Sequence, residues 1–141
     1  MKSSTNLIQQ LISISSLSGQ EGQIIQYIDQ ALIILGINTQ KIGENLVAHI
    51  KGTNQSKAIV FNAHVDTVQP GDEKLWKYSP LLGKLVGDKV FGLGASDEKA
   101  GVAGLMILAE NFSQNKPPCD VWFHFVVKEE VDGSGTKQTM N

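Results

Sequence analysis

Apolar residues recur at helical spacing in the first part of the chain and predict two helices there. The first apolar face consists of Leu7, Ile8, Leu11 and Ile12. A second helix is predicted over residues 21–35, where apolar positions keep the same spacing. Ser18 and Glu21 have capping-box spacing at its start, and Gly36 follows where a helix commonly ends in a left-handed turn.

Apolar runs of strand length come next and alternate with a further helical pattern. Strands are predicted at residues 45–50, 58–63 and 121–127, and the run at 58–63 is typical of a strand covered on both faces. Residues 85–91 predict a short strand pair. A helix face is formed by Val102, Leu105, Met106, Ala109 and Phe112. Helices that alternate with buried strands favour a layered α/β fold with a largely parallel sheet, which could include antiparallel pairs.

Composition narrows the classes of partner. A chain of 141 residues, 41% of them hydrophobic, is long enough for one domain with its own core. The net charge is −2 and the basic residues are scattered, so we expect no nucleic-acid partner. The amino-terminal segment lacks the apolar core of a secretory signal, and no apolar run reaches membrane length. We therefore expect a cytoplasmic protein without a membrane partner.

Ionisable residues collect where the predicted strands end. His64 and Asp66 follow one apolar strand, and Glu129 and Glu130 follow another. Asp97 lies in the loop before the helix that contains Val102. Ligands of open α/β sheets bind beyond the carboxyl ends of the strands, so these side chains are expected at one edge.

These residue types favour a metal site. Asp66 lies two residues after His64 on an extended backbone, so its carboxylate can orient the imidazole ring. An imidazole with several carboxylates suits zinc or a similar transition metal better than calcium or magnesium. Neighbouring Glu129 and Glu130 point in different directions, so that one can ligate while the other handles protons.

Each element also has a structural interpretation. His64 alone could be a hydrogen-bonded histidine at a strand end, Asp97 could cap the following helix, and the two glutamates could be solvated. Gly92 and Gly94 imitate the start of a dinucleotide-binding loop. Asp97 occupies the sixth position of that motif, however, and its charge would repel a pyrophosphate, which disfavours nucleotide binding.

Three motifs in order carry a resemblance to a known family. AHVDTV at residues 63–68, GLGASDEKAG at 92–101 and KEEVDGSGT at 128–136 resemble the co-catalytic zinc metallopeptidases, which include acetylornithine deacetylase, succinyl-diaminopimelate desuccinylase and carboxypeptidase G. The resemblance implies a three-layer α/β sandwich with a largely parallel mixed sheet. It also implies that residues 1–141 form the amino-terminal part of the catalytic domain, without its carboxy-terminal part or the lid or dimerisation domain. A homodimer is expected only for a full-length form.

The resemblance further implies a role for each site residue. His64 would ligate one zinc ion, Asp97 would bridge two, and Glu130 would ligate the other, with Co²⁺ as a possible substitute. Asp66 would orient His64, and Glu129 would be the general base that takes a proton from the attacking water. The peptide bond after Asp97 would be cis. Glu98 departs from the methionine that is common in the family at that position, and the remaining metal ligands would lie beyond residue 141.

The implied reaction is hydrolysis of an amide bond in a small substrate. Removal of an acyl group from an N-acyl amino acid is the preferred activity, and a dipeptidase or carboxypeptidase of the same family is the alternative. A third hypothesis is a truncated, non-catalytic remnant or binding module. The motifs do not identify the substrate, and we expect no efficient turnover from residues 1–141 alone.

Overall fold

The computed structural model describes residues 3–140. Its helices are α1 (Ser4–Ser13), α2 (Gly22–Ile34), α3 (Lys99–Gln114) and α4 (Ser134–Thr139), with a short 3-10 turn at Glu73–Leu75. Its strands are β1 (Asn38–Ile42), β2 (Asn45–Ile50), β3 (Asn54–His64), β4 (Lys84–Val86), β5 (Lys89–Phe91) and β6 (Cys119–Val126). Every helix and strand expected from the apolar pattern is present. The polar strand β1 was not expected.

The α/β class is confirmed, and the main sheet is mixed. Its strand order is β1-β2-β6-β3. Strands β3 and β6 pair in parallel, whereas β1 with β2 and β2 with β6 pair antiparallel. The parallel share is smaller than the sequence pattern suggested, because β1 and β2 are joined by only Gly43 and Glu44, and so short a connection forces an antiparallel hairpin. Gly43 has φ 62°, a conformation that glycine adopts readily.

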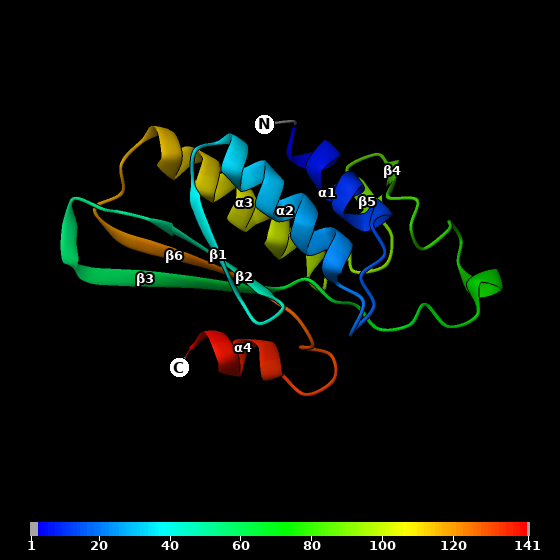
Figure 1. Cartoon of the computed structure of the whole chain (residues 1–141). Helices are drawn as coiled ribbons and strands as arrows, with labels where there is room; N and C mark the ends of the chain where they lie inside the picture. Colours follow the sequence, from blue (N-terminus) through cyan, green and yellow to red (C-terminus); the bar gives the residue numbers. More distant parts are fainter. Residues whose placement is uncertain (1–2, 141) are drawn as a thin grey trace.

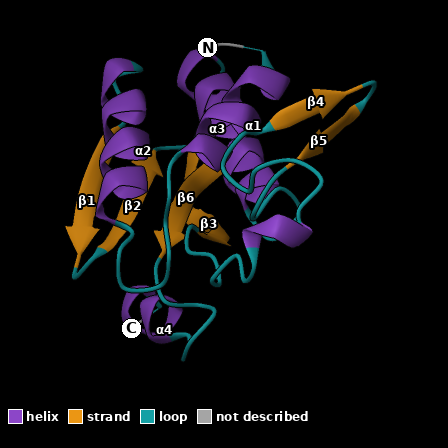
Figure 2. Cartoon of the chain, turned by 90° about the vertical axis from the view of Figure 1, so that its right-hand side faces the viewer, coloured by secondary structure: helices purple, strands orange, loops and turns teal. Residues whose placement is uncertain are grey.

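The elements form three layers (Figure 1). Helices α1, α2 and α3 cover one face of the sheet, and α4 lies on the other. The hairpin of β4 and β5 stands beside α1, apart from the main sheet (Figure 2). The core lies between the three longer helices and the sheet, and its fully buried side chains include Leu11, Ile24, Ile28, Leu32, Leu46, Phe123 and Phe125.

The start of α2 differs from the expected capping box. The residue at the N-cap is Glu21, and its side chain makes no capping hydrogen bond. The Ser18 hydroxyl instead donates to Asp66 at 2.6 Å. Asp66 is fully buried, and a carboxylate removed from water requires hydrogen-bond donors. At the other end of the helix, Gly36 has φ 74° and gives the left-handed turn that was predicted.

Strand β3 is not covered on both faces along its length, which corrects the expectation for residues 58–63. Ile59 and Val60 are 47% and 44% exposed, whereas Ala63 and His64 at its end are buried. The reason is that β3 is an edge strand in the described chain, with β6 as its one neighbour in the sheet. Its buried end is the part that reaches the site described below.

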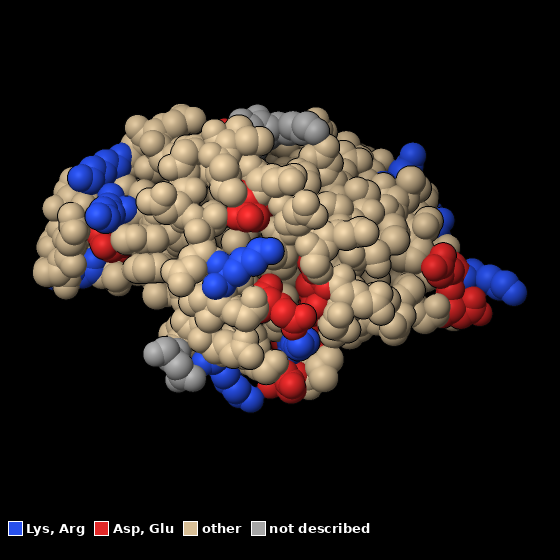
Figure 3. All heavy atoms as spheres, viewed as in Figure 1, with Lys and Arg blue, Asp and Glu red and all other residues tan. Residues whose placement is uncertain are grey.

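The surface carries charges of both signs. On the face shown in Figure 3, lysine and acidic side chains are interspersed over a mostly uncharged surface. Within residues 3–140, no helix combines the length and the apolar character needed to cross a membrane.

The exposed edge of β3 predicts self-association of the chain, because the unpaired edge of a strand with apolar side chains is a template for pairing with another copy. Val60→Lys should reduce concentration-dependent association in sedimentation velocity. Gln40→Lys is the matched control, since it adds the same charge to the exposed, polar strand β1 at the opposite edge. Equal association of both variants and the parent chain would contradict the prediction.

Candidate metal centre

The parallel pair of β3 and β6 brings two loops to one edge of the sheet. His64, the last residue of β3, lies opposite Val126, the last residue of β6. The chain therefore leaves both strands at the same edge, where Glu129 and Glu130 follow β6. Asp97 reaches this edge from the loop before α3. Placement at the carboxyl ends of the strands agrees with the general position of ligand sites in α/β sheets.

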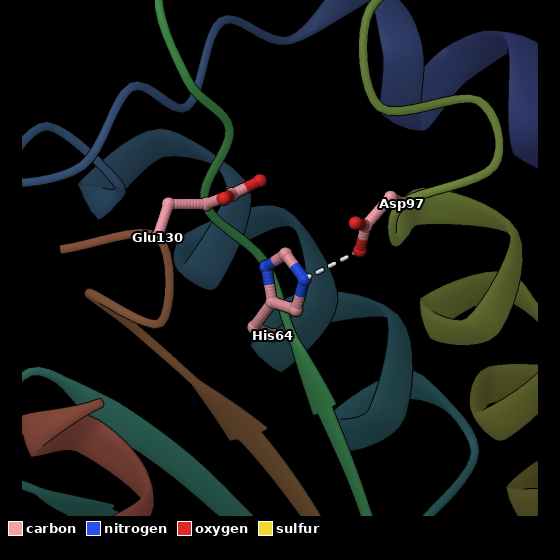
Figure 4. Close-up of side chains that lie close together, drawn as sticks. All are labelled: His64, Asp97 and Glu130. Carbon is pink, nitrogen blue, oxygen red and sulfur yellow. Dashed lines mark hydrogen bonds and ion pairs between the residues drawn. The ribbon is translucent and has the colours of Figure 1, made fainter. Parts of the chain in front are cut away.

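Three of the predicted site residues converge. The Nε2 atom of His64 lies 2.9 Å from Oδ1 of Asp97. His64, Asp97 and Glu130 each offer a nitrogen or oxygen ligand atom, and these atoms all lie within 4.8 Å of one another. Asp97 and Glu130 lie on opposite sides of the His64 ring (Figure 4). These three residues could hold metal, and their roles as ligands stay predictions.

Asp66 contacts the other nitrogen of the same ring. Nδ1 of His64 lies 3.1 Å from the backbone oxygen of Asp66 and 3.4 Å from its Oδ1. Burial alone would raise the pKa of Asp66, but hydrogen bonds from His64, Ser18 and the amides of Glu129 and Glu130 hold this pKa at about 2. Asp66 is thus a permanent anion on the Nδ1 side, which leaves Nε2 directed at Asp97.

The surrounding carboxylates change the protonation of His64 itself. The hydrogen-bonding contact with Asp66 raises the pKa of His64 to about 9 against the opposing effect of burial, and Asp97 and Glu98 add to the rise. Without a metal ion, the ring is therefore an imidazolium at neutral pH. A cation is favoured at this position, whether it is a proton or a metal ion.

Glu129 and Glu130 differ in their surroundings, although they are neighbours. The Glu129 side chain is 51% exposed, and its Oε2 lies 3.9 Å from Nε2 of His64. Burial raises the pKa of Glu130. The two carboxylates therefore present different chemistry to one site, with Glu129 the more accessible to solvent.

Glu98 contributes to the site in a way the sequence did not indicate. Its Oε2 accepts a hydrogen bond from the backbone amide of His64 at 2.9 Å and lies 3.7 Å from the Nε2 atom of the same residue. The departure from the family pattern at this position thus adds a carboxylate that holds the end of β3. Ser18 was also missed, because its spacing to Glu21 fits a capping box equally well.

The loop that carries Asp97 is held in place by the residue that begins α3. The peptide bond between Asp97 and Glu98 is cis, as predicted. Lys99 is 1% exposed, and its Nζ donates to the backbone oxygen of Ile14, just after α1, at 2.7 Å. Burial lowers the pKa of Lys99 to about 8. The first turn of α3 is therefore tied to the end of α1, and Asp97 lies directly before that turn.

Comparison with known proteins gives the family. The model of peptidase family M20/M25/M40 matches residues 60–141, which contain all five predicted site residues. The chain belongs to this family. Succinyl-diaminopimelate desuccinylase of Buchnera aphidicola subsp. Cinara cedri is 29% identical over 134 residues, which cover 92% of this chain and 35% of that relative. The enzyme of the same name from Coxiella burnetii is 27% identical, and the matched region covers all of this chain and 39% of that relative.

Solved structures give the same fold. A metallo-carboxypeptidase of this M20 family from Sulfolobus solfataricus superposes with a TM-score of 0.83 at 19% identity, covering 99% of this chain and 34% of that one. Human carnosine dipeptidase 1 gives a TM-score of 0.80 at 18% identity, with coverage of 97% and 34%. A Bacillus subtilis member described as a dinuclear metal binding peptidase gives 0.72 at 22% identity, with coverage of 97% and 38%. This M20 chain thus spans somewhat over a third of the length of the relatives and structures it matches.

The raised pKa of His64 predicts proton release on metal binding. A metal ion needs the neutral ring, so the apparent Zn²⁺ affinity should rise about tenfold for each pH unit below a pKa of about 9 and level off above it. Calorimetry at neutral pH in buffers with different ionisation enthalpies would count the released protons. His49→Gln, at a histidine outside the cluster, should leave this count unchanged. Binding without proton release would contradict the prediction.

Asp97 is the most exposed of the three clustered residues, and its substitution tests the site with the least disturbance of the core. Asp97→Asn should weaken Zn²⁺ binding by more than about a hundredfold, since loss of an outer-shell partner alone costs up to that much. Asp88→Asn, in the exposed turn between β4 and β5, is the control. Equal affinities of both variants in calorimetry would show that Asp97 is not a ligand.

Proposed function

We propose that this chain is the amino-terminal part of the catalytic domain of a zinc-dependent amidohydrolase that removes the acyl group from N-acyl amino acids, as acetylornithine deacetylase and succinyl-diaminopimelate desuccinylase do. The observation that carries the proposal is the convergence of His64, Asp97 and Glu130, with Glu129 next to them. Membership of the M20 family supports metal-dependent hydrolysis. The desuccinylase relatives support the choice of an N-acyl amino acid as substrate.

The donor set fits zinc. One imidazole nitrogen and carboxylate oxygens are ligands that zinc accepts, whereas calcium and magnesium prefer oxygen alone. The carboxylate of Asp66 lies against Nδ1 of His64, which is the usual outer partner of a metal-ligating histidine. In the proposal, His64 would ligate one zinc ion, Glu130 would ligate the other and Asp97 would serve both, with further ligands supplied from outside residues 1–141. Co²⁺ could replace zinc.

The proposed reaction assigns the proton transfers to Glu129. Zinc supplies Lewis-acid chemistry, which polarises the amide carbonyl and lowers the pKa of water. Glu129 takes a proton from the water as the water oxygen attacks the amide carbon. Glu129 then gives that proton to the amide nitrogen as the carbon–nitrogen bond breaks. The products are a carboxylic acid and a free amine. The exposure of Glu129 suits this role because a general base must reach both water and substrate.

A peptidase of the same family is the second candidate. The solved structures that share this fold include the carboxypeptidase from Sulfolobus solfataricus and human carnosine dipeptidase 1. Both reactions break an amide bond with the same proton transfers, so His64, Asp97, Glu129 and Glu130 would serve either substrate. The two candidates differ in the residues that would bind the rest of the substrate, away from the amide bond that is cleaved.

An activity panel separates the two candidates. The complete product of the gene that encodes this chain, supplied with Zn²⁺ or Co²⁺, should hydrolyse N-succinyl or N-acetyl amino acids faster than unblocked dipeptides. Cleavage of dipeptides alone would favour the peptidase. Binding of metal without hydrolysis of any substrate in the panel would favour a non-catalytic module.

The assignment of Glu129 as the general base predicts a loss of turnover without a loss of metal. Glu129→Gln should lower kcat by on the order of 10²–10⁴-fold, the usual contribution of general acid–base catalysis. Zinc content, measured by atomic absorption, should stay at the parent level. Glu73→Gln, in the exposed 3-10 turn, is the control for the loss of one carboxylate. A fall in zinc content that matched the fall in kcat would identify Glu129 as a ligand instead.

A further inference from the structure

Four consecutive backbone amides, at residues 127–130, each donate to a side-chain oxygen from another part of the chain. Their acceptors are Asn45 Oδ1 for Val127 (3.0 Å), Glu21 Oε1 for Lys128 (3.1 Å), Asp66 Oδ1 for Glu129 (3.1 Å) and Asp66 Oδ2 for Glu130 (3.2 Å). The three acceptor residues are 0–3% exposed. The loop that carries both glutamates is therefore held by buried side chains from three distant segments.

Glu21 makes an unusual contribution to this arrangement. It stands at the N-cap of α2, where an acceptor side chain commonly bonds to the amides of its own helix. Its side chain makes no such bond. The carboxylate, on a residue that is 3% exposed, accepts instead from the amide of Lys128, 107 positions later in the chain. A buried carboxylate is costly, so its use at this amide rather than at its own helix needs a reason.

Lys128 supplies that reason. It has φ 59°, the one positive value among the non-glycine residues that the structure describes. A residue with a Cβ enters this left-handed region at an energetic cost and stays there only when its surroundings hold it. The reversal at Lys128 sets the direction in which the next two residues leave β6. The side chain of Lys128 forms an ion pair with the exposed Glu44.

We propose that Glu21 is a positioning residue for the metal centre: by accepting the Lys128 amide, it holds Lys128 in the left-handed conformation and so directs Glu129 and Glu130 at His64 and Asp97. Asp66 receives the next two amides, so the two acids fix three successive residues. The inference rests on the function proposed above, in that the two glutamates matter because they serve the metal site. In this proposal the backbone conformation of Lys128 depends on Glu21, which binds its amide, and not on Glu44, which pairs with its side chain.

Four variants separate reach, charge and fold. Glu21→Ala removes the acceptor. Glu21→Gln keeps an acceptor oxygen at the same reach without the charge, and Glu21→Asp keeps the charge but draws the acceptor back by one methylene. Glu44→Ala is the matched control, because it removes an acid that contacts the same lysine through its side chain only.

Two measurements on the chain of residues 1–141 compare these variants with the parent. Amide hydrogen exchange by NMR reports the Lys128 and Glu129 amides without any metal. Titration with Co²⁺ alone, followed by its visible absorption, reports affinity and ligand geometry. Glu21→Ala and Glu21→Asp should lose protection of the Lys128 amide against exchange. They should also weaken Co²⁺ binding by about tenfold to a hundredfold and alter the Co²⁺ spectrum. Glu21→Gln and Glu44→Ala should match the parent chain in both measurements.

Equal behaviour of all four variants would overturn the inference. If Glu21→Ala does not fold, Glu21→Asp and Glu21→Gln decide it: a loss in the first with a normal second supports positioning, and equal results overturn it. If the parent chain itself binds no Co²⁺, the metal-site proposal fails for this chain, and the exchange of the Lys128 amide alone then decides whether Glu21 holds the loop.

Discussion

The buried carboxylate of Asp66 is the interaction on which the site depends. It is fully buried and stays ionised, with a pKa of about 2, because four neighbours supply hydrogen bonds to it. Those neighbours come from the loop before α2, the end of β3 and the loop after β6. Removal of this anion would leave donors from all three segments without their acceptor, and an unsatisfied buried polar group is costly.

The parallel pairing of β3 and β6 makes this interaction possible. Only strands that run in the same direction deliver their carboxyl ends to one edge, and the register that sets His64 against Val126 brings the two following loops within reach of Asp66. The antiparallel hairpin of β1 and β2 extends the sheet on the far side of β6. A mixed sheet therefore serves the same purpose as the largely parallel sheet that the sequence suggested.

An excess of negative charge is the main electrostatic feature of the site. His64 is surrounded by carboxylates of Asp66, Asp97, Glu98 and Glu129 within 3.9 Å of its ring nitrogens. Of these, Asp66, Asp97 and Glu98 raise the pKa of His64 to about 9, so the site has a demand for a positive charge. A divalent cation would meet this demand more fully than a proton. The charge of the site and its donor atoms thus favour the same occupant.

The sequence by itself predicted most of the helices and strands, the family motifs and the candidate site residues, because apolar periodicity and motif spacing are local properties of the chain. It also indicated that the carboxylate of Asp66 can reach the ring of His64, since residues two apart on an extended backbone point to the same side. Only the tertiary structure decided what Ser18, Glu21, Asn45 and Glu98 do. Each uses a side-chain oxygen on a group distant in sequence, and one spacing, such as that of Ser18 and Glu21, is compatible with a helix cap or with a contact across the fold. Which of these forms depends on the donors and acceptors that packing buries together, and that is settled only when β3, β6 and the loops around them are assembled.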